Sequence, residues 1–159
     1  MRAILFVKTV LTHPYLAFIL RLYIAGVFIY ASMYKFNYTA QFAESIASYQ
    51  IAPYWAINIV AVTLPWVELI SGILLIAGFR SRSATVVIGS LLIFFTLAII
   101  VNLMRGNYIS CGCFQATGGT ISWWIVGRDI IWLMMTIQVF FYDKAFHLEN
   151  RFRLAIKEI

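Results

Sequence analysis

Four apolar runs, each long enough to cross a membrane, dominate the pattern of hydrophobic and polar positions along the chain. A helix of about 20 residues spans the ~30 Å hydrocarbon core of a bilayer. Because a backbone in lipid must satisfy its own hydrogen bonds, we predict that each run forms a helix. The runs cover about residues 15–36, 54–79, 84–104 and 122–142. The sequence therefore predicts an all-α integral membrane four-helix bundle, with residues 1–159 as a single domain.

Two further stretches have a different pattern. Between the first and second runs, Phe42, Ile46 and Tyr49 recur at helical spacing among polar residues. This spacing predicts a short amphipathic helix that lies in the membrane interface. After the last run, residues 143–159 carry Lys144, Arg151, Arg153 and Lys157 beside apolar residues. We interpret this tail as a basic helix on the membrane surface.

The composition supports a membrane protein and argues against a soluble domain. Hydrophobic residues make up 63% of the chain and charged residues 11%, which is outside the usual range of soluble proteins. The net charge of +6 is compatible with nucleic-acid binding, but the basic residues stand at the ends of the apolar runs. Membrane topology and anionic lipid account for that placement. We therefore expect the lipid bilayer as a partner, and no nucleic acid.

The distribution of basic residues predicts the orientation of the four spans. One side carries eight of them: Arg2, Lys8, Arg80, Arg82, Lys144, Arg151, Arg153 and Lys157. The other side carries Lys35 and Arg105. The positive-inside rule then places both termini in the cytoplasm. We predict a bacterial inner-membrane protein whose connector between the third and fourth spans faces the periplasm, where disulfides persist.

That connector holds the only two cysteines, Cys111 and Cys113, on either side of Gly112. A disulfide that closes so small a loop stabilises little. It is also strained, and strain favours a disulfide that is readily reduced. We interpret the pair as a reversible dithiol; a static disulfide and two packed thiols are the alternatives. Structural zinc usually takes four Cys or His ligands, and both histidines are predicted on the opposite side, so we expect no metal.

Charged and amide side chains within the spans are the other candidates. Arg21 and Glu68 are both expected near mid-membrane, where we predict that they pair, as a structural ion pair rather than a proton relay. Arg128 and Asp129 lie in the fourth span, and a cation near a thiol lowers its pKa. Four residues are therefore predicted to support the cysteines: Asn102, Arg105, Arg128 and Asp129.

Several of these residues resemble a known family of membrane proteins. The first half looks like the DoxX-type four-helix membrane proteins, in Arg21, Lys35, Tyr49, Pro53, Pro65, Glu68, Gly72 and Gly78. The second half is similar to the MauE branch of that group, in Asn102, Arg105-Gly106, Cys111-Gly112-Cys113-Phe114, Trp123-Trp124 and Arg128-Asp129. The resemblance covers about residues 20–141, and it departs at Gln115, where a glycine is expected.

The resemblance implies a redox-associated protein that is linked to disulfide formation in exported proteins. Through the DoxX relatives it also implies a quinone as electron acceptor, to which we assign no residues. The layout is similar to that of the vitamin K epoxide reductase type, as an analogy of architecture. We therefore hypothesise a membrane thiol–disulfide redox protein that acts on an exported thiol or disulfide partner, with one cysteine attacking and the other resolving.

Two alternative hypotheses stay open. The first is a non-enzymatic membrane scaffold or assembly factor, in which a disulfide between Cys111 and Cys113 only holds the connector. The second is a small transporter that uses Arg21 and Glu68 as ion or proton sites. Reaction of the cysteines with thiols distinguishes the redox hypothesis from the scaffold.

Overall fold

The computed structural model describes residues 14–50, 53–106 and 121–143. Within them the chain forms helices α2 (Pro14–Asn37), α3 (Thr39–Ser48), α4 (Tyr54–Ala77), α5 (Ser81–Met104) and α6 (Trp123–Tyr142). All of these except α3 are long and apolar enough to cross a membrane. The predicted all-α architecture, with four spans and a short helix between the first two, is confirmed. The predicted basic tail helix lies outside the described residues.

The turn between α4 and α5 is tighter than the sequence suggested. Helix α4 ends at Ala77, not at residue 79, because Gly78 adopts the left-handed conformation with φ 66°. The N–H groups of Gly78 and Phe79 donate to the carbonyls of Leu75 and Leu74, both at 3.2 Å. This arrangement is a Schellman motif, which satisfies the last carbonyls of a helix. Helix α5 then begins at Ser81, three residues earlier than the predicted start at residue 84.

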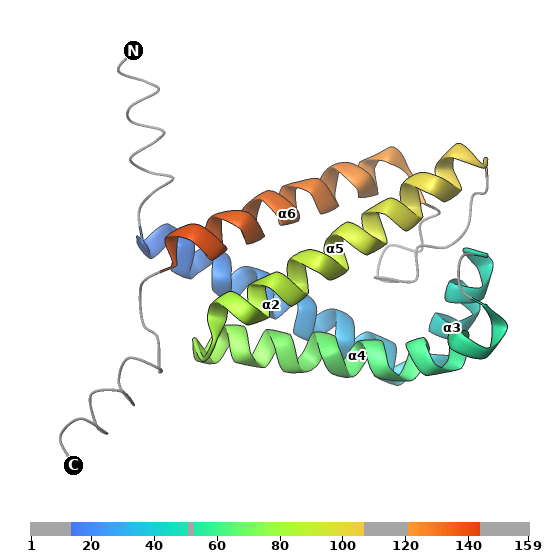
Figure 1. Cartoon of the computed structure of the whole chain (residues 1–159), viewed down its shortest axis with the longest axis horizontal. Coiled ribbons are helices and arrows are strands. Elements are labelled where there is room, and N and C mark those ends of the chain that lie inside the picture. The colour runs from blue at the N-terminus through green and yellow to red at the C-terminus, as the bar shows by residue number, and fades with distance from the viewer. Residues whose placement is uncertain (1–13, 51–52, 107–120, 144–159) are drawn as a thin grey trace.

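The four long helices share one apolar core. In Figure 1, α2, α4, α5 and α6 form the body of the bundle and α3 lies at one of its ends. The larger buried cluster takes residues from all four: Ile24, Ala25, Phe28, Leu75, Ala84, Ile88, Leu92 and Val139. The outer surface is also apolar, with Ile70, Phe94 and Met134 more than half exposed. Such a surface suits lipid rather than water.

Helices α2 and α4 approach each other closely at Gly72. A Cβ atom on Gly72 would lie 2.8 Å from Cγ1 of Ile29 and 3.2 Å from the carbonyl oxygen of Ala25. A residue without a side chain is therefore needed here for the two backbones to come together, as is common between membrane helices. This contact sets the register of α2 against α4, and it places Ala25 and Ile29 level with Gly72.

Replacing Gly72 with alanine is expected to destabilise the bundle by about 1–3 kcal/mol, the usual cost of overpacking. The carbonyl of Ala25 belongs to the backbone and has little freedom to move away. Gly26→Ala and Gly127→Ala are matched controls, because a Cβ at either position meets nothing within 4 Å. Denaturation of the purified variants in detergent measures the difference. Equal stability of Gly72→Ala and the two controls would show that the close approach is not needed.

Helix α3 packs mainly on α4, with Phe42 as its buried residue. Its far end is held by α5, because Nδ2 of Asn102 donates to the carbonyl of Tyr49 at 3.4 Å. The short helix therefore covers the end of the bundle at which α5 finishes and α6 begins (Figure 1). Its position in the interface of a bilayer stays a prediction.

Candidate functional site

The predicted reactive pair, Cys111 and Cys113, lies outside the described residues. The structure describes the chain that leads to this connector and the chain that follows it. Before it, α5 ends and the exposed Arg105 caps the helix. After it, Ile121 is buried with Ile99 and Val126 in a second, smaller core cluster. The described chain thus leaves the bundle and returns to it at the end covered by α3.

Asn102 is fully buried at the same end of the bundle. Its Nδ2 atom donates to the carbonyl of Ala98 at 3.0 Å as well as to that of Tyr49. Its Oδ1 atom is buried and accepts no hydrogen bond in the described part of the chain. Asn102 therefore ties α5 to the end of α3, which is a structural task; its predicted support of the cysteines stays a prediction, as does that of Arg105.

The predicted ion pair between Arg21 and Glu68 is not formed. Nη1 of Arg21 instead lies 3.0 Å from Oδ2 of Asp143, directly after α6, and both side chains are about 2% exposed or less. The prediction assumed that Lys35, near the end of α2, is level with Pro53, directly before α4. The contact of Gly72 with Ala25 and Ile29 shows a different register, which leaves Arg21 at the end of the bundle, beside the last residues of α6.

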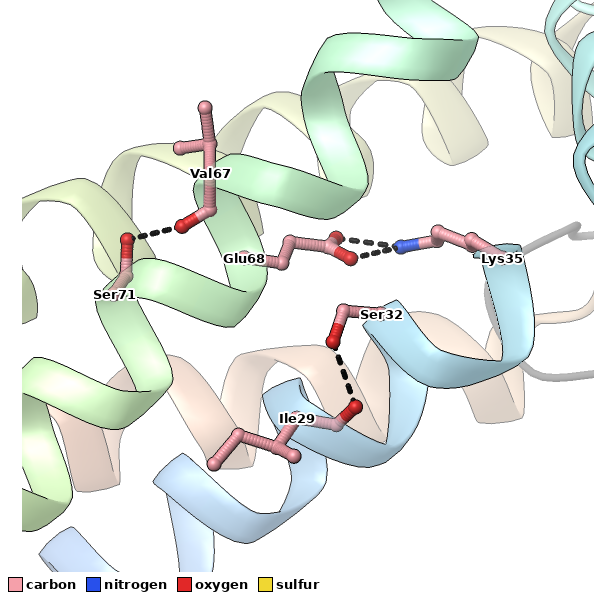
Figure 2. Close-up of polar contacts among 6 residues, drawn as sticks. All are labelled: Ile29, Ser32, Lys35, Val67, Glu68 and Ser71. Carbon is pink, nitrogen blue, oxygen red and sulfur yellow. Dashed lines mark hydrogen bonds and ion pairs between the residues drawn. The ribbon is translucent and has the colours of Figure 1, made fainter. Parts of the chain in front are cut away.

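Glu68 pairs with Lys35, near the end of α2. The Lys35 ammonium donates to both carboxylate oxygens of Glu68, at 2.5 and 2.7 Å (Figure 2). Both side chains are 2% exposed, and Lys35 also lies 5.1 Å and 5.3 Å from the ring centres of Phe42 and Phe95. Lys35 was predicted among the basic residues of the outer side; in the structure its side chain points into the bundle. The available signal was its position on the face of α2 that also carries Arg21 and Phe28, at intervals of seven residues.

Arg128 and Asp129, which were predicted to support the cysteines, form an ion pair with each other as neighbours on α6. Nη2 of Arg128 lies 3.0 Å from Oδ1 of Asp129, and Nε of Arg128 donates to the same oxygen at 3.2 Å. Asp129 is buried, whereas the Arg128 side chain is 28% exposed. The guanidinium lies over the ring of Trp132, 4.5 Å from its centre, which is a favourable cation–π position.

A small cavity inside the bundle brings the two ion pairs together. Its volume is about 30 Å³, and its wall includes Lys35, Glu68, Arg128 and Asp129. The rest of the wall is apolar, from Phe28, Ala31, Leu92, Phe95 and Trp132. One water needs roughly 10–15 Å³ of such space and two to four polar partners. The cavity therefore has room and partners for about two waters.

A larger groove opens on the outer surface between α2 and α6. Its volume is about 510 Å³, and it is lined by Leu22, Tyr23, Gly26, Val27, Tyr30, Arg128 and Trp132. We call it the α2–α6 groove. Arg128 and Trp132 line both the groove and the internal cavity, so they form the wall between the two. Sequence analysis missed this groove. The groove is open because Gly26 has no side chain to fill it, and a single glycine in an apolar helix gives no periodic pattern in the sequence.

Metal binding finds no support in the described part of the chain. No group of three or more His, Cys, Asp or Glu side chains there is arranged to hold an ion. The four charged residues of the cavity form two pairs of opposite sign. The polar centre of the bundle is therefore electrically balanced.

Comparisons with known proteins point to one family. A family model described as methylamine utilisation protein MauE matches residues 13–142. The methylamine utilization protein MauE of Paracoccus denitrificans is 28% identical over 131 residues, which is 81% of this chain and 70% of that protein. The protein of the same description from Paracoccus versutus is 31% identical over 132 residues, covering 82% of this chain and 71% of its own. No solved structure matches the chain significantly.

Proposed function

Because the chain belongs to the methylamine utilisation protein MauE family, we propose that it supports methylamine utilisation as a membrane thiol–disulfide redox protein. Cys111 and Cys113 are the proposed reactive pair. The observation that carries the proposal is their position: they lie within the stretch that matches the family model, in the connector between the last two spans. The +6 charge distribution supports an orientation with both termini in the cytoplasm and this connector outside.

The chemistry is exchange with an exported partner protein. The thiolate of one cysteine attacks one sulfur of a partner disulfide, and the other partner sulfur leaves as a thiolate. The second cysteine then attacks the mixed disulfide and releases the partner. Two electrons and two protons pass from the pair to the partner, and the reverse sequence oxidises the partner. The direction follows from the relative reduction potentials of the two pairs.

A lipid-soluble quinone is the second acceptor that this proposal names by chemical class. When bound, a quinone supplies a two-electron, two-proton reduction. The α2–α6 groove fits such a group, because it opens at the outer surface, is mostly apolar and has the Arg128 guanidinium in its lining. The residues that would hold it are Arg128, Trp132 and Tyr30. The exchange with a partner protein does not depend on it.

A membrane-impermeant alkylating mass tag on intact cells tests the proposal. The pair is expected to be oxidised at rest, to take up two tags after mild reduction, and to be labelled from outside. In the single variants Cys111→Ala and Cys113→Ala, the remaining thiol is expected to accumulate as a mixed disulfide with the partner in the variant that keeps the attacking cysteine. The double variant serves as the labelling control.

Two outcomes would favour other functions. A disulfide that resists reduction in the folded protein, and single variants that trap no adduct, would support the membrane scaffold with a structural disulfide. Labelling only after the membrane is opened would overturn the proposed orientation, and with it the exported partner.

A further inference from the structure

We propose that the α2–α6 groove is a lateral binding site for a neutral, lipid-soluble ligand whose flat head group carries hydrogen-bond-accepting oxygens. The groove is about 510 Å³ in volume and is open along the outer surface of the bundle, so that a ligand in it would stay in contact with lipid. The inference deepens the proposed function and rests on it for any redox role of the ligand. Binding itself is a separate claim with its own test.

The shape of the groove comes from a missing side chain. Gly26 lies near the middle of α2, and a Cβ atom built on it meets nothing within 4 Å. Gly72 shows the opposite case, because its Cβ would collide with α2. The packing of the described helices therefore does not require glycine at position 26. Its effect is to leave the groove open between Tyr23 and Tyr30, which are 50% and 57% exposed.

The electrostatics of the groove select a neutral head group. Arg128 is the charged residue in its lining, and it is paired at 3.0 Å with Asp129 directly behind it. The pair has no net charge, so an anionic head group gains little by entering from lipid, where an uncompensated charge is costly. A guanidinium only donates hydrogen bonds. A neutral oxygen acceptor, such as a carbonyl, is therefore the matching chemistry.

The aromatic lining favours a flat head group with an apolar tail. Trp132 carries the Arg128 guanidinium on its face, 4.5 Å from the ring centre, and Tyr23 and Tyr30 stand on the other side of the groove. Flat groups stack favourably on such rings. The remaining lining, Leu22, Gly26 and Val27, is apolar and faces lipid, as an acyl or isoprenoid tail requires.

The groove is also linked to the polar centre of the bundle. Arg128 and Trp132 separate it from the internal cavity that holds Glu68 and Asp129. A ligand oxygen at Arg128 would be separated by that side chain from the internal cavity. The cavity is lined by the carboxyl groups of Glu68 and Asp129 and has room for water. Glu68 and Asp129 are thus the carboxyl groups on the far side of Arg128 and Trp132 from the groove.

Gly26→Leu is the sharpest test, because leucine fills the groove without a clash at its Cβ atom. Gly127→Leu is the matched control: Gly127 is also exposed, its Cβ also meets nothing within 4 Å, and it does not line the groove. The probe is decylubiquinone, titrated into full-length protein in lipid nanodiscs and followed by quenching of tryptophan fluorescence. Trp132→Phe identifies the part of the quenching that comes from the groove.

Gly26→Leu is expected to weaken binding of decylubiquinone by at least about tenfold, since filling a pocket by a few methylene groups has effects of this size. Gly127→Leu is expected to bind like the wild type. Decylbenzene, which has a flat ring and the same tail but no oxygens, is added in competition with decylubiquinone and is expected to displace it with at least about tenfold weaker affinity. Equal binding by Gly26→Leu and Gly127→Leu would overturn the site, and equal binding of the two probes would overturn the role of the oxygens.

The cysteine-labelling experiment separates this inference from the proposed function. If Gly26→Leu loses the probe while the cysteines still exchange with a partner, the groove is a ligand site that partner exchange does not require. If the probe binds as expected but the cysteines never exchange, the binding site stands and the redox function fails.

Discussion

Replacement of Lys35 by methionine is expected to lower the free energy of unfolding by about 3–5 kcal/mol, the usual cost of breaking a buried ion pair on one side. The carboxylate of Glu68 would stay 2% exposed and would lose a donor that now bonds both of its oxygens. Methionine keeps most of the length of the lysine stem, so the packing against Phe42 and Phe95 is disturbed little. The loss therefore reports on the charge rather than on a cavity.

The double variant Lys35→Met/Glu68→Leu provides the control. Replacing both members of a buried pair with apolar residues is often neutral, so the double variant is expected to recover most of the stability lost in Lys35→Met. Denaturant titration in detergent, followed by circular dichroism, measures all three proteins. If the two substitutions simply add their costs, the two side chains do not act as a pair.

Removal of the Asp143 carboxylate is expected to have the second-largest effect. Asp143→Ala takes away both oxygens that bond Nη1 of Arg21, at 3.0 and 3.3 Å. The guanidinium is 1% exposed, and leaving a buried charged donor without these bonds costs about 1.5–3 kcal/mol. We expect a smaller loss than for Lys35→Met, because Asp143 lies directly after the last span and Lys35 and Glu68 lie within spans.

Asp143→Asn is the matched control for this pair. It keeps one acceptor oxygen and the shape of the side chain, so it is expected to retain part of the lost stability. The same denaturant titration ranks the three proteins as wild type, Asp143→Asn and Asp143→Ala. An Asp143→Ala variant as stable as the wild type would show that the contact between Arg21 of α2 and Asp143 after α6 contributes nothing.

The spans and the short helix between them were predictable from the sequence, whereas the pairing of charges was not. An apolar run long enough to span the lipid must form a helix, because only a helix satisfies the backbone hydrogen bonds of a single segment there. The ends of the runs were less certain, because the left-handed Gly78 stops α4 before its apolar residues do. Periodicity gives the inward face of a helix, but it does not give the stagger between helices.

That stagger explains the error at Arg21 and Glu68. The contact at Gly72 aligns α4 with Ala25 and Ile29, which brings Glu68 to Lys35 and Arg21 to Asp143. The sequence also could not distinguish a glycine that packs, such as Gly72, from one that opens a groove, such as Gly26. Both stand in apolar helices, and the difference is which neighbour lies opposite. The pairing of Arg128 with Asp129 was not predicted either, although adjacent opposite charges within a span could have suggested it.

The two buried pairs also impose an order on how the chain enters the membrane. The first span carries two cations, Arg21 and Lys35, and no anion. Synthesis proceeds from the N-terminus, so the anion for Lys35 arrives with the second span, and the anion for Arg21 only after the fourth. Until then α2 is a poorly inserted helix. The two cations of α2 are therefore neutralised in two stages, Lys35 first and Arg21 second. Because the second stage needs Asp143, stable insertion of α2 depends on completion of α6.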